Sequence, residues 1–159
     1  MEMTFDQLYD YDWFAISTDG YIAHFATGGT GAIPDKLHRN PDLIQQIKVS
    51  LIASLSPSSD YIINPNLESY RPKELLGGID VYLSSYIQMA SLGLFSFDTL
   101  QDDDMPSSYY LVAEPRTPIH IQQLPHSVQE MLAEFHLASL NLADKELGIV
   151  FPAIRESRL

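Results

Sequence analysis

The first regular pattern in the chain is a pair of short apolar runs on either side of a turn. Residues 12–18 and 21–27 are rich in aromatic and aliphatic side chains, and Asp19-Gly20 stands between them. An Asp-Gly pair in this position is typical of a two-residue type I′ turn. We therefore predict a β-hairpin at the N-terminus. The predicted cross-strand pairs are Thr18–Tyr21, Ile16–Ala23 and Phe14–Phe25.

This predicted register divides the hairpin into an apolar face and a mixed face. The apolar face is expected to point into the core, because side chains on one face of a strand pair share one environment. The mixed face is expected either to be half-solvated or to be covered by something small and polar. Its residues are Trp13, Ala15, Ser17, Ile22, His24 and Ala26.

Two later segments have the apolar spacing of amphipathic helices. The first begins at Asn40-Pro41-Asp42, where Asn40 suits the cap and Pro41 the first helical position, and it ends near Ser56-Pro57. The second covers Ile79 to Leu92, and its narrow polar side predicts burial over much of its circumference. Residues 56–78, between these helices, are expected to be irregular with one short extended or helical piece.

The last third of the chain has the alternation of half-buried strands. A short helix is also expected there, followed by one more strand. The predicted strands are 95–98, 109–113, 119–122 and 135–141, and the helix is 125–132.

Together these elements predict a single α+β domain over residues 1–159. Its sheet is expected to be mainly antiparallel, with the N-terminal hairpin and with two to three helices packed on it. The polar tail at 153–159 is expected to be frayed.

Composition and charge narrow the functional classes. The chain is 45% hydrophobic and 19% charged, which is typical of a folded domain, and it has no cysteine for disulfides or thiolate chemistry. It carries 9 Lys and Arg against 21 Asp and Glu, a net charge of −12. This charge disfavours nucleic acid and anionic membranes and favours a basic protein as partner. No signal peptide and no membrane-spanning run is recognisable, so we expect a cytoplasmic protein.

A glycine-rich loop follows the predicted hairpin. Such a turn can bind a phosphate through its backbone N–H groups. The sequence continues Ala32-Ile33-Pro34, however, which fits neither the P-loop nor the dinucleotide pattern, so the alternative is a turn that needs positive φ or close packing. His24, nearby on the mixed face, is either a ligand contact or an ordinary buried polar residue. The candidate ligand-binding residues are His24, Gly28, Gly29, Thr30 and Gly31.

No known catalytic or metal-binding motif is present. The chain lacks a Gly-x-Ser-x-Gly elbow and a His-Glu-x-x-His helix, so we predict no catalytic residue. His126, Glu130 and Glu134 share a four-residue spacing that can hold a metal, but this spacing is also common on solvated helix faces. We therefore predict neither a metal nor a cofactor.

Aromatic and acidic residues gather near the start of the chain, and a second acidic run lies at 102–104. Tyrosine and tryptophan are favoured at binding hot spots, and acidic side chains steer a cationic partner. The alternatives are that the aromatics fill the core and that the acidic run is a solvated loop tip. The predicted partner-binding residues are Tyr9, Asp10, Tyr11, Asp12, Trp13, Asp102, Asp103 and Asp104.

The stretch from Asp12-Trp13-Phe14-Ala15 through His24-Phe25-Ala26-Thr27-Gly28-Gly29-Thr30-Gly31 also has a family resemblance. It resembles the opening of small acidic bacterial proteins with a DWFAxDxxGxIAxFxTGGxG pattern, some of which are similar to immunity proteins of polymorphic toxin systems. The resemblance covers roughly residues 10–34, and Ser17 stands where the pattern commonly has Asp. It implies an α+β fold and a bacterial cytoplasmic setting.

Three functional hypotheses follow. The first is a non-enzymatic bacterial protein-binding module, of the immunity type, that neutralises a cationic partner. The second is a small-ligand-binding or hydrolytic domain whose pocket, near the hairpin and the glycine-rich loop, exposes His24. The third is a structural or regulatory subunit that forms a homodimer through the mixed face of the hairpin.

Overall fold

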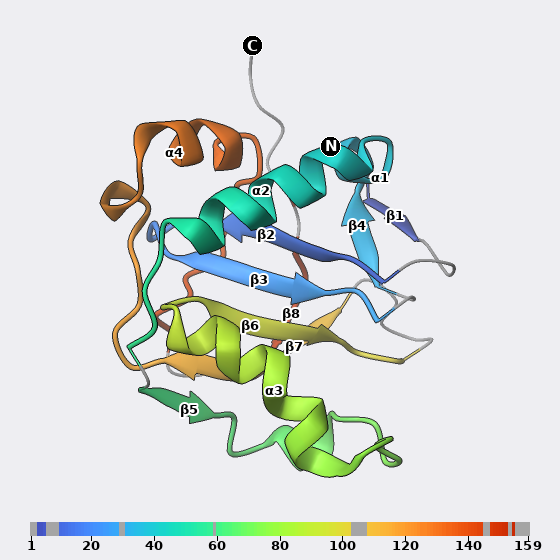
Figure 1. The fold of residues 1–159 in the computed structure, drawn as a ribbon. Coiled ribbons are helices and arrows are strands. Elements are labelled where there is room, and N and C mark those ends of the chain that lie inside the picture. Colours follow the sequence, from blue (N-terminus) through green and yellow to red (C-terminus); the bar gives the residue numbers. More distant parts are fainter. Residues whose placement is uncertain are drawn as a thin grey trace.

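The computed structural model describes residues 3–5, 10–28, 31–58, 60–102, 108–144, 147–152 and 154. Its centre is a mixed sheet with the strand order β2-β3-β6-β7-β5, and β8 pairs with β7 (Figure 1). The β3–β6 pair is parallel and the others are antiparallel, so the predicted α+β class with a mainly antiparallel sheet is confirmed. The strands are β2 (Asp12–Ile16), β3 (Ile22–Ala26), β5 (Tyr61–Ile63), β6 (Phe95–Thr99), β7 (Tyr109–Pro115) and β8 (Ile149–Val150).

The remaining strands form a separate antiparallel pair, β1 (Met3–Phe5) with β4 (Ala32–Pro34). Helices α2 and α3 cover the same face of the central sheet, with α2 over β2 and α3 over β6 and β7 (Figure 1). Both agree with the predicted helices, as does α4. The helices are α1 (Asp35–His38), α2 (Pro41–Ala53), α3 (Gly78–Ser91) and α4 (His126–Leu132), with 3₁₀ turns η1 (Leu67–Ser69) and η2 (Ile121–Gln123).

The hairpin of β2 and β3 exists, but its predicted register is wrong by one residue. The loop contains Thr18, Asp19 and Gly20, since the Ser17 N–H donates to the Tyr21 carbonyl, and Gly20 has φ +85°. A three-residue loop that ends in a left-handed glycine is the next most common hairpin connection after the two-residue turns. The carboxylate of Asp19 also accepts the backbone N–H groups of residues 142 and 143, which ties the loop to a distant segment.

This shift changes which side chains share a face. Phe14 lies opposite His24, and Trp13 lies opposite Phe25. Both faces of the hairpin are buried within the chain, so the expectation of a half-solvated mixed face is wrong. The same burial removes the mixed face as a homodimer interface.

Helix α3 is less buried than its pattern predicted. Its buried side chains are Tyr86, Met89 and Ala90, all in its C-terminal half. Val81 in the first half is exposed, and Leu76 just before the helix is 98% exposed. The predicted burial over much of the helix is therefore wrong, because fully buried side chains occur only in the second half, while Tyr82 and Leu83 in the first half are partly buried against the sheet.

Two predicted strands near the C-terminus are also wrong. Residues 121–123 form the 3₁₀ turn η2, capped by His120, whose Nδ1 accepts the N–H of Gln122. Residues 135–141 make only isolated bridges, Ile16 with His136 and Leu137 with Ile154. Ser139 has φ +56°, which interrupts an extended conformation.

Two smaller expectations concern the middle segment and the tail. The segment 56–78 contains β5 and η1, two short elements where one was expected. Within the predicted frayed tail only Ile154 is described, and it is buried. The other residues of that tail lie outside the described part of the chain.

Candidate functional site

Three strand ends meet at one end of the central sheet. Strands β3 and β6 are parallel and end there, and β2 begins there because it is antiparallel to β3. Asp12 and Asp98 therefore lie opposite the same residue of β3. Exposed Asp10 precedes β2, and its Oδ1 accepts the N–H of Gly28 at 3.0 Å. Exposed Asp102 follows β6, so the fold brings the two predicted acidic segments to the same end of the sheet.

The glycine-rich loop at this end is used for close packing. The N–H of Gly28 binds Asp10, and that of Gly31 donates to the Thr27 carbonyl at 2.7 Å. A Cβ on Gly31 would lie 2.5 Å from the hydroxyl of Tyr109. These two N–H groups are therefore not free for a phosphate, and close packing with positive φ at Gly28 explains both glycines. The other residues predicted in this loop, Gly29 and Thr30, lie outside the described residues.

Trp13 was predicted to contact a partner, and its burial contradicts this. The side chain is 1% exposed, its ring stacks on Phe25 with centroids 4.4 Å apart, and its Nε1–H donates to the Tyr109 hydroxyl at 3.3 Å. The hairpin register is the cause, because it places Trp13 on the aromatic face of the sheet. Tyr11 is half-buried and packs against the same core. Three further predicted contacts, Tyr9, Asp103 and Asp104, lie outside the described residues.

Asp12, His24 and Ser96 form a hydrogen-bonded chain on the face covered by the helices. His24 Nε2 lies 2.7 Å from Asp12 Oδ1, and His24 Nδ1 lies 2.7 Å from Ser96 Oγ. Lys48 of α2 binds the other oxygen of Asp12 at 2.7 Å. Burial raises the pKa of Asp12, but the hydrogen bonds and charges of His24 and Lys48 outweigh it and hold that pKa well below its usual range.

Ser, His and Asp are the residue types of a hydrolase triad, but this chain is closed to a substrate. His24 and Ser96 are both 0% exposed, and the His24 ring lies between Phe14 and Tyr86, at centroid distances of 5.4 and 6.3 Å. A nucleophile must reach its substrate, so we interpret the arrangement as a satisfied buried network. The predicted pocket with an exposed His24 is therefore wrong.

A second polar cluster surrounds Asp98. The hydroxyls of Tyr82 and Tyr110 donate to its Oδ2 at 2.8 and 2.9 Å, and the backbone N–H of Thr99 donates to its Oδ1 at 2.8 Å. Burial raises the pKa of Asp98, while these hydrogen bonds lower it in part. Burial and the charge of Asp98 also raise the pKa of Tyr82, Tyr86 and Tyr110, so the phenols remain protonated donors.

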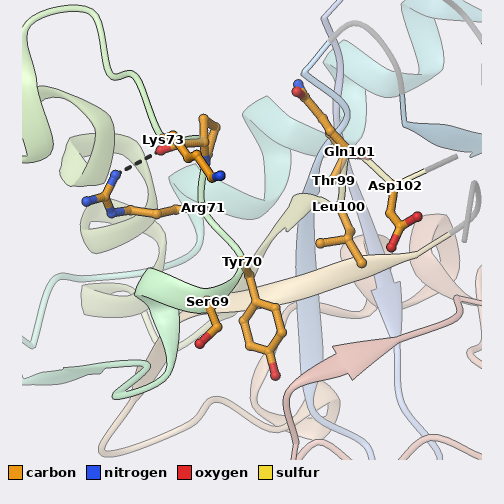
Figure 2. Close-up of a pocket in the computed structure, with 9 residues that line it drawn as sticks. Ser69, Tyr70, Arg71, Lys73, Thr99, Leu100, Gln101 and Asp102 are labelled. Carbon is orange, nitrogen blue, oxygen red and sulfur yellow. Dashed lines mark hydrogen bonds between the residues drawn. The ribbon is translucent and has the colours of Figure 1, made fainter.

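A cavity of about 700 Å³ opens beside this cluster (Figure 2). One wall is the segment from Ser69, the last residue of η1, to Lys73, and the other is the end of β6 and the following residues up to Asp102. The Tyr70 ring lies 5.8 Å from the ring of Tyr110, which connects the wall to the Asp98 cluster. A second cavity of about 400 Å³ is also lined by Tyr70 and includes Glu114, whose pKa burial raises.

Sequence reasoning missed the residues that build these clusters. Ser96 and Asp98 are polar residues two apart on β6, so the alternation already placed them on one face. That pattern was an available signal for a polar group under the helices. Arg71 and Lys73, in contrast, lie in an irregular segment, and no pattern there indicates a cavity wall.

The described ranges contain neither a cluster of metal ligands nor a membrane-spanning helix. No group of three His, Asp or Glu side chains there is arranged to hold a metal ion. His126 pairs with Glu130, and Glu134 pairs with Lys36 of α1. Among the helices described, none has the length and apolar character to cross a membrane.

Comparison with known proteins identified no relative: no family model, no curated protein and no solved structure matches this chain.

Proposed function

We propose that this protein is a bacterial, cytoplasmic binding module of the immunity type, which neutralises a basic protein. The observation that supports this proposal is the acidic end of the sheet, defined by Asp10, Asp12 and Asp102. Asp10 and Asp102 are exposed there, on segments that are about 90 residues apart in the chain.

The distribution of cations supports the same interpretation. Among the described residues, four cations form ion pairs with carboxylates of the chain itself, namely Lys36, Arg39, Lys48 and Arg71. The net charge of −12 therefore leaves an excess of carboxylates at the surface. Such a surface attracts a basic partner, and an acidic protein can block a nuclease by occupying the surface that binds phosphate. The resemblance of residues 10–34 to immunity-related proteins agrees with this proposal.

The test is capture of a partner from an extract of the native host at low ionic strength, followed by kinetics with the purified partner. We expect a basic partner whose association rate falls as salt increases. The double variant Asp10→Asn/Asp102→Asn should lower the association rate about tenfold at low salt, because steering charges act mainly on association. Asn at position 10 retains an oxygen to accept the Gly28 N–H.

The matched control is Asp42→Asn/Asp60→Asn, which removes the same charge from exposed positions at the start of α2 and before β5. We expect the control to retain most of the wild-type rate. The proposal fails if the association rate falls by the same factor in both double variants. It also fails if binding does not depend on salt.

A further inference from the structure

The cavity of about 400 Å³ contains a carboxylate that has no partner among the described residues. This carboxylate is that of Glu114, which is half-buried near the end of β7. No hydrogen bond or ion pair joins it to another residue of the described chain, and burial raises its pKa with no neighbouring group to lower it. Asp144 also lines the cavity, but it already interacts within the chain. Glu114 is therefore the carboxylate left to a ligand.

A bulge in β7 brings Glu114 into this cavity. Phe97 of β6 pairs with Leu111. Ser96, one residue earlier, pairs with Ala113, so β7 contains one extra residue between the two pairs. In a regular strand, residues three apart lie on opposite faces, and an extra residue shifts this alternation by one. Leu111 and Glu114 can therefore line the same cavity, as they do here.

Hydrogen bonds fix the other walls of the cavity to β7. Asn64 follows β5, and its side-chain amide donates to the Leu111 carbonyl at 2.8 Å. The Leu111 N–H donates to the carbonyl of Gly148, before β8, at 2.9 Å. Ile62 of β5 lies directly opposite Glu114 in the β5–β7 pair. The cavity is therefore formed by a hydrogen-bonded framework, and its volume is in the range of small-molecule sites.

The remaining lining suits a positive charge that is attached to a short hydrocarbon chain. Apolar side chains there include Pro65 and Leu147, and none of the described lining residues is Lys, Arg or His. The hydroxyl of Tyr70 lies beside Gly148, since a Cβ on that glycine would be 3.8 Å from it. A phenol oxygen can accept a hydrogen bond from a cation, and an aromatic ring attracts one.

We propose that this cavity binds a small organic cation, a primary amine or a guanidine with a short hydrocarbon part. The cationic group of the ligand pairs with Glu114, and the hydrocarbon part packs on Leu147 and on the ring of Tyr70. A half-buried carboxylate without a partner is unfavourable, and a charge-assisted hydrogen bond from the ligand removes that cost. The net charge of −12 also raises the local concentration of cations.

This site is separate from the acidic end of the sheet, on which the proposed function depends. Thr99, the last residue of β6, pairs with Tyr109 at the start of β7, because the two strands are antiparallel. Glu114 is near the end of β7 and therefore lies toward the other end of the sheet. A substitution of Glu114 leaves the acidic end unchanged.

The experiment titrates the full chain with four probes at neutral pH and fixed ionic strength, and it follows NMR shifts of assigned amides. Pentylamine and butylguanidine are the cations, and they distinguish an ammonium from a guanidinium group. Pentanol has no charge, and pentanoate has the opposite charge. We expect at least one cation to saturate the protein and to bind about tenfold more tightly than pentanol, with shifts at 62–66, 111–114 and 147–148. Pentanoate should not bind.

Two variants assign the contacts. Glu114→Gln should weaken the cation about tenfold and leave pentanol unchanged. It should remain folded, because burial disfavours the charge that it removes. Gly148→Leu fills the space beside the Tyr70 hydroxyl and should weaken both the cation and pentanol, and the backbone tolerates it because Gly148 does not have a positive φ. Glu74→Gln, the same change at an exposed position outside the cavity, is the matched control and should bind like the wild type.

The proposal is overturned if neither cation saturates the protein, if pentanol binds as tightly as both cations, or if the shifted amides lie outside the three segments. Equal losses of affinity in Glu114→Gln and Glu74→Gln would overturn it as well, because they would indicate general attraction of cations to a negative protein. Glu114→Gln also separates this proposal from the proposed function, since it should leave the association rate with the basic partner unchanged.

Discussion

At the scale of single residues, the polar groups under the helices are arranged as partners of one another. Both ring nitrogens of His24 are hydrogen-bonded, one to Asp12 and the other to Ser96. Asp98 accepts hydrogen bonds from two phenol hydroxyls. Because an unpaired buried polar group is costly, such networks contribute to a single well-defined packing of the core. The same residues would suggest a hydrolase if only their types were considered, and their burial is the decisive difference.

Gly20 and Gly78 allow a test of single-residue packing, because they share a left-handed conformation with φ of +85° and +84°. A Cβ on Gly20 would lie 2.1 Å from His120 Nε2, whereas a Cβ on Gly78 has nothing within 4 Å. Gly78→Ala should therefore lower the free energy of unfolding by about 1 kcal/mol, from backbone conformation alone.

Gly20→Ala should lower the free energy of unfolding by about 2–3 kcal/mol, because His120 must also move and lose the hydrogen bond that it accepts from the Gln122 N–H. Urea denaturation of both variants measures the difference. Equal losses of unfolding free energy in Gly20→Ala and Gly78→Ala would contradict this expectation, because they would show that moving His120 does not destabilise the fold.

At the scale of elements, the two long helices were predictable and the short strands were less so. Helix α2 extends over thirteen residues, enough for a repeating apolar spacing, and Pro41 marks its first turn. The predicted strand at 119–122 contains only four residues. Residues 121–123 form a 3₁₀ turn instead, which is capped by His120. Short alternating runs are compatible with several conformations, so tertiary contacts select among them.

Helix α2 provides a matched pair for the contribution of its buried face. Leu51 is 0% exposed and Val49, two residues earlier, is 56% exposed. We expect Leu51→Ala to lower the free energy of unfolding by about 2–5 kcal/mol through lost burial and a cavity. Val49→Ala should change it by less than about 0.5 kcal/mol, because the side chain is solvated and alanine favours the helix. Thermal and chemical denaturation measure both changes, and a large loss in Val49→Ala would mean that this face is covered.

At the scale of the whole molecule, the parallel pairing of β3 with β6 determines where the acidic groups lie. It places the residues after β6 beside the start of β2, although the two segments are distant in the chain. Asp10, Asp12 and Asp102 then share one end of the sheet, next to the cavity of Tyr70. The proposed partner surface results from this arrangement.

The pH dependence of stability belongs to the same scale, because it sums over all groups. The pKa of Asp12 is lower in the folded chain than its ordinary value of 3.8, so the folded state binds fewer protons there. Its contribution is therefore present above pH 3.8 and is lost as the pH falls through and below that value. Asp98 acts in the opposite direction. Because its pKa is raised in the folded chain, stability falls as the pH increases above the ordinary pKa of an aspartate, 3.8.

We expect Asp12→Asn to be less stable than the wild type at neutral pH and to lose less stability on acidification below pH 3.8. Urea denaturation across the acid range measures the difference between the two proteins. Gln46→Ala, at an exposed position of α2 that carries no titratable group, is the control, and its curve should run parallel to that of the wild type. Parallel curves for wild type and Asp12→Asn would contradict the linkage of Asp12 to folding.

The candidate site was predictable only in part, because some of its residues are identified by local properties and others only by packing between distant segments. Asp10 and Asp102 were identified as acidic surface residues, because charge and loop context are local properties of the chain. Trp13 was assigned to the surface, because its face depends on a hairpin register that differs by one residue. Lys73 was not identified, because its position opposite Asp102 depends on packing between segments far apart in the chain.

The amino-acid sequence by itself determined the α+β class, the two long helices, the existence of the hairpin and the strongly acidic character of the protein. These features depend on local periodicity and on composition, which tertiary contacts do not change. Only the tertiary structure decided the hairpin register, the burial of His24 and Trp13, and the cavity between Lys73 and Asp102. The physical reason is that burial and proximity depend on which distant segments pack together, and that choice is made by the free energy of the whole fold.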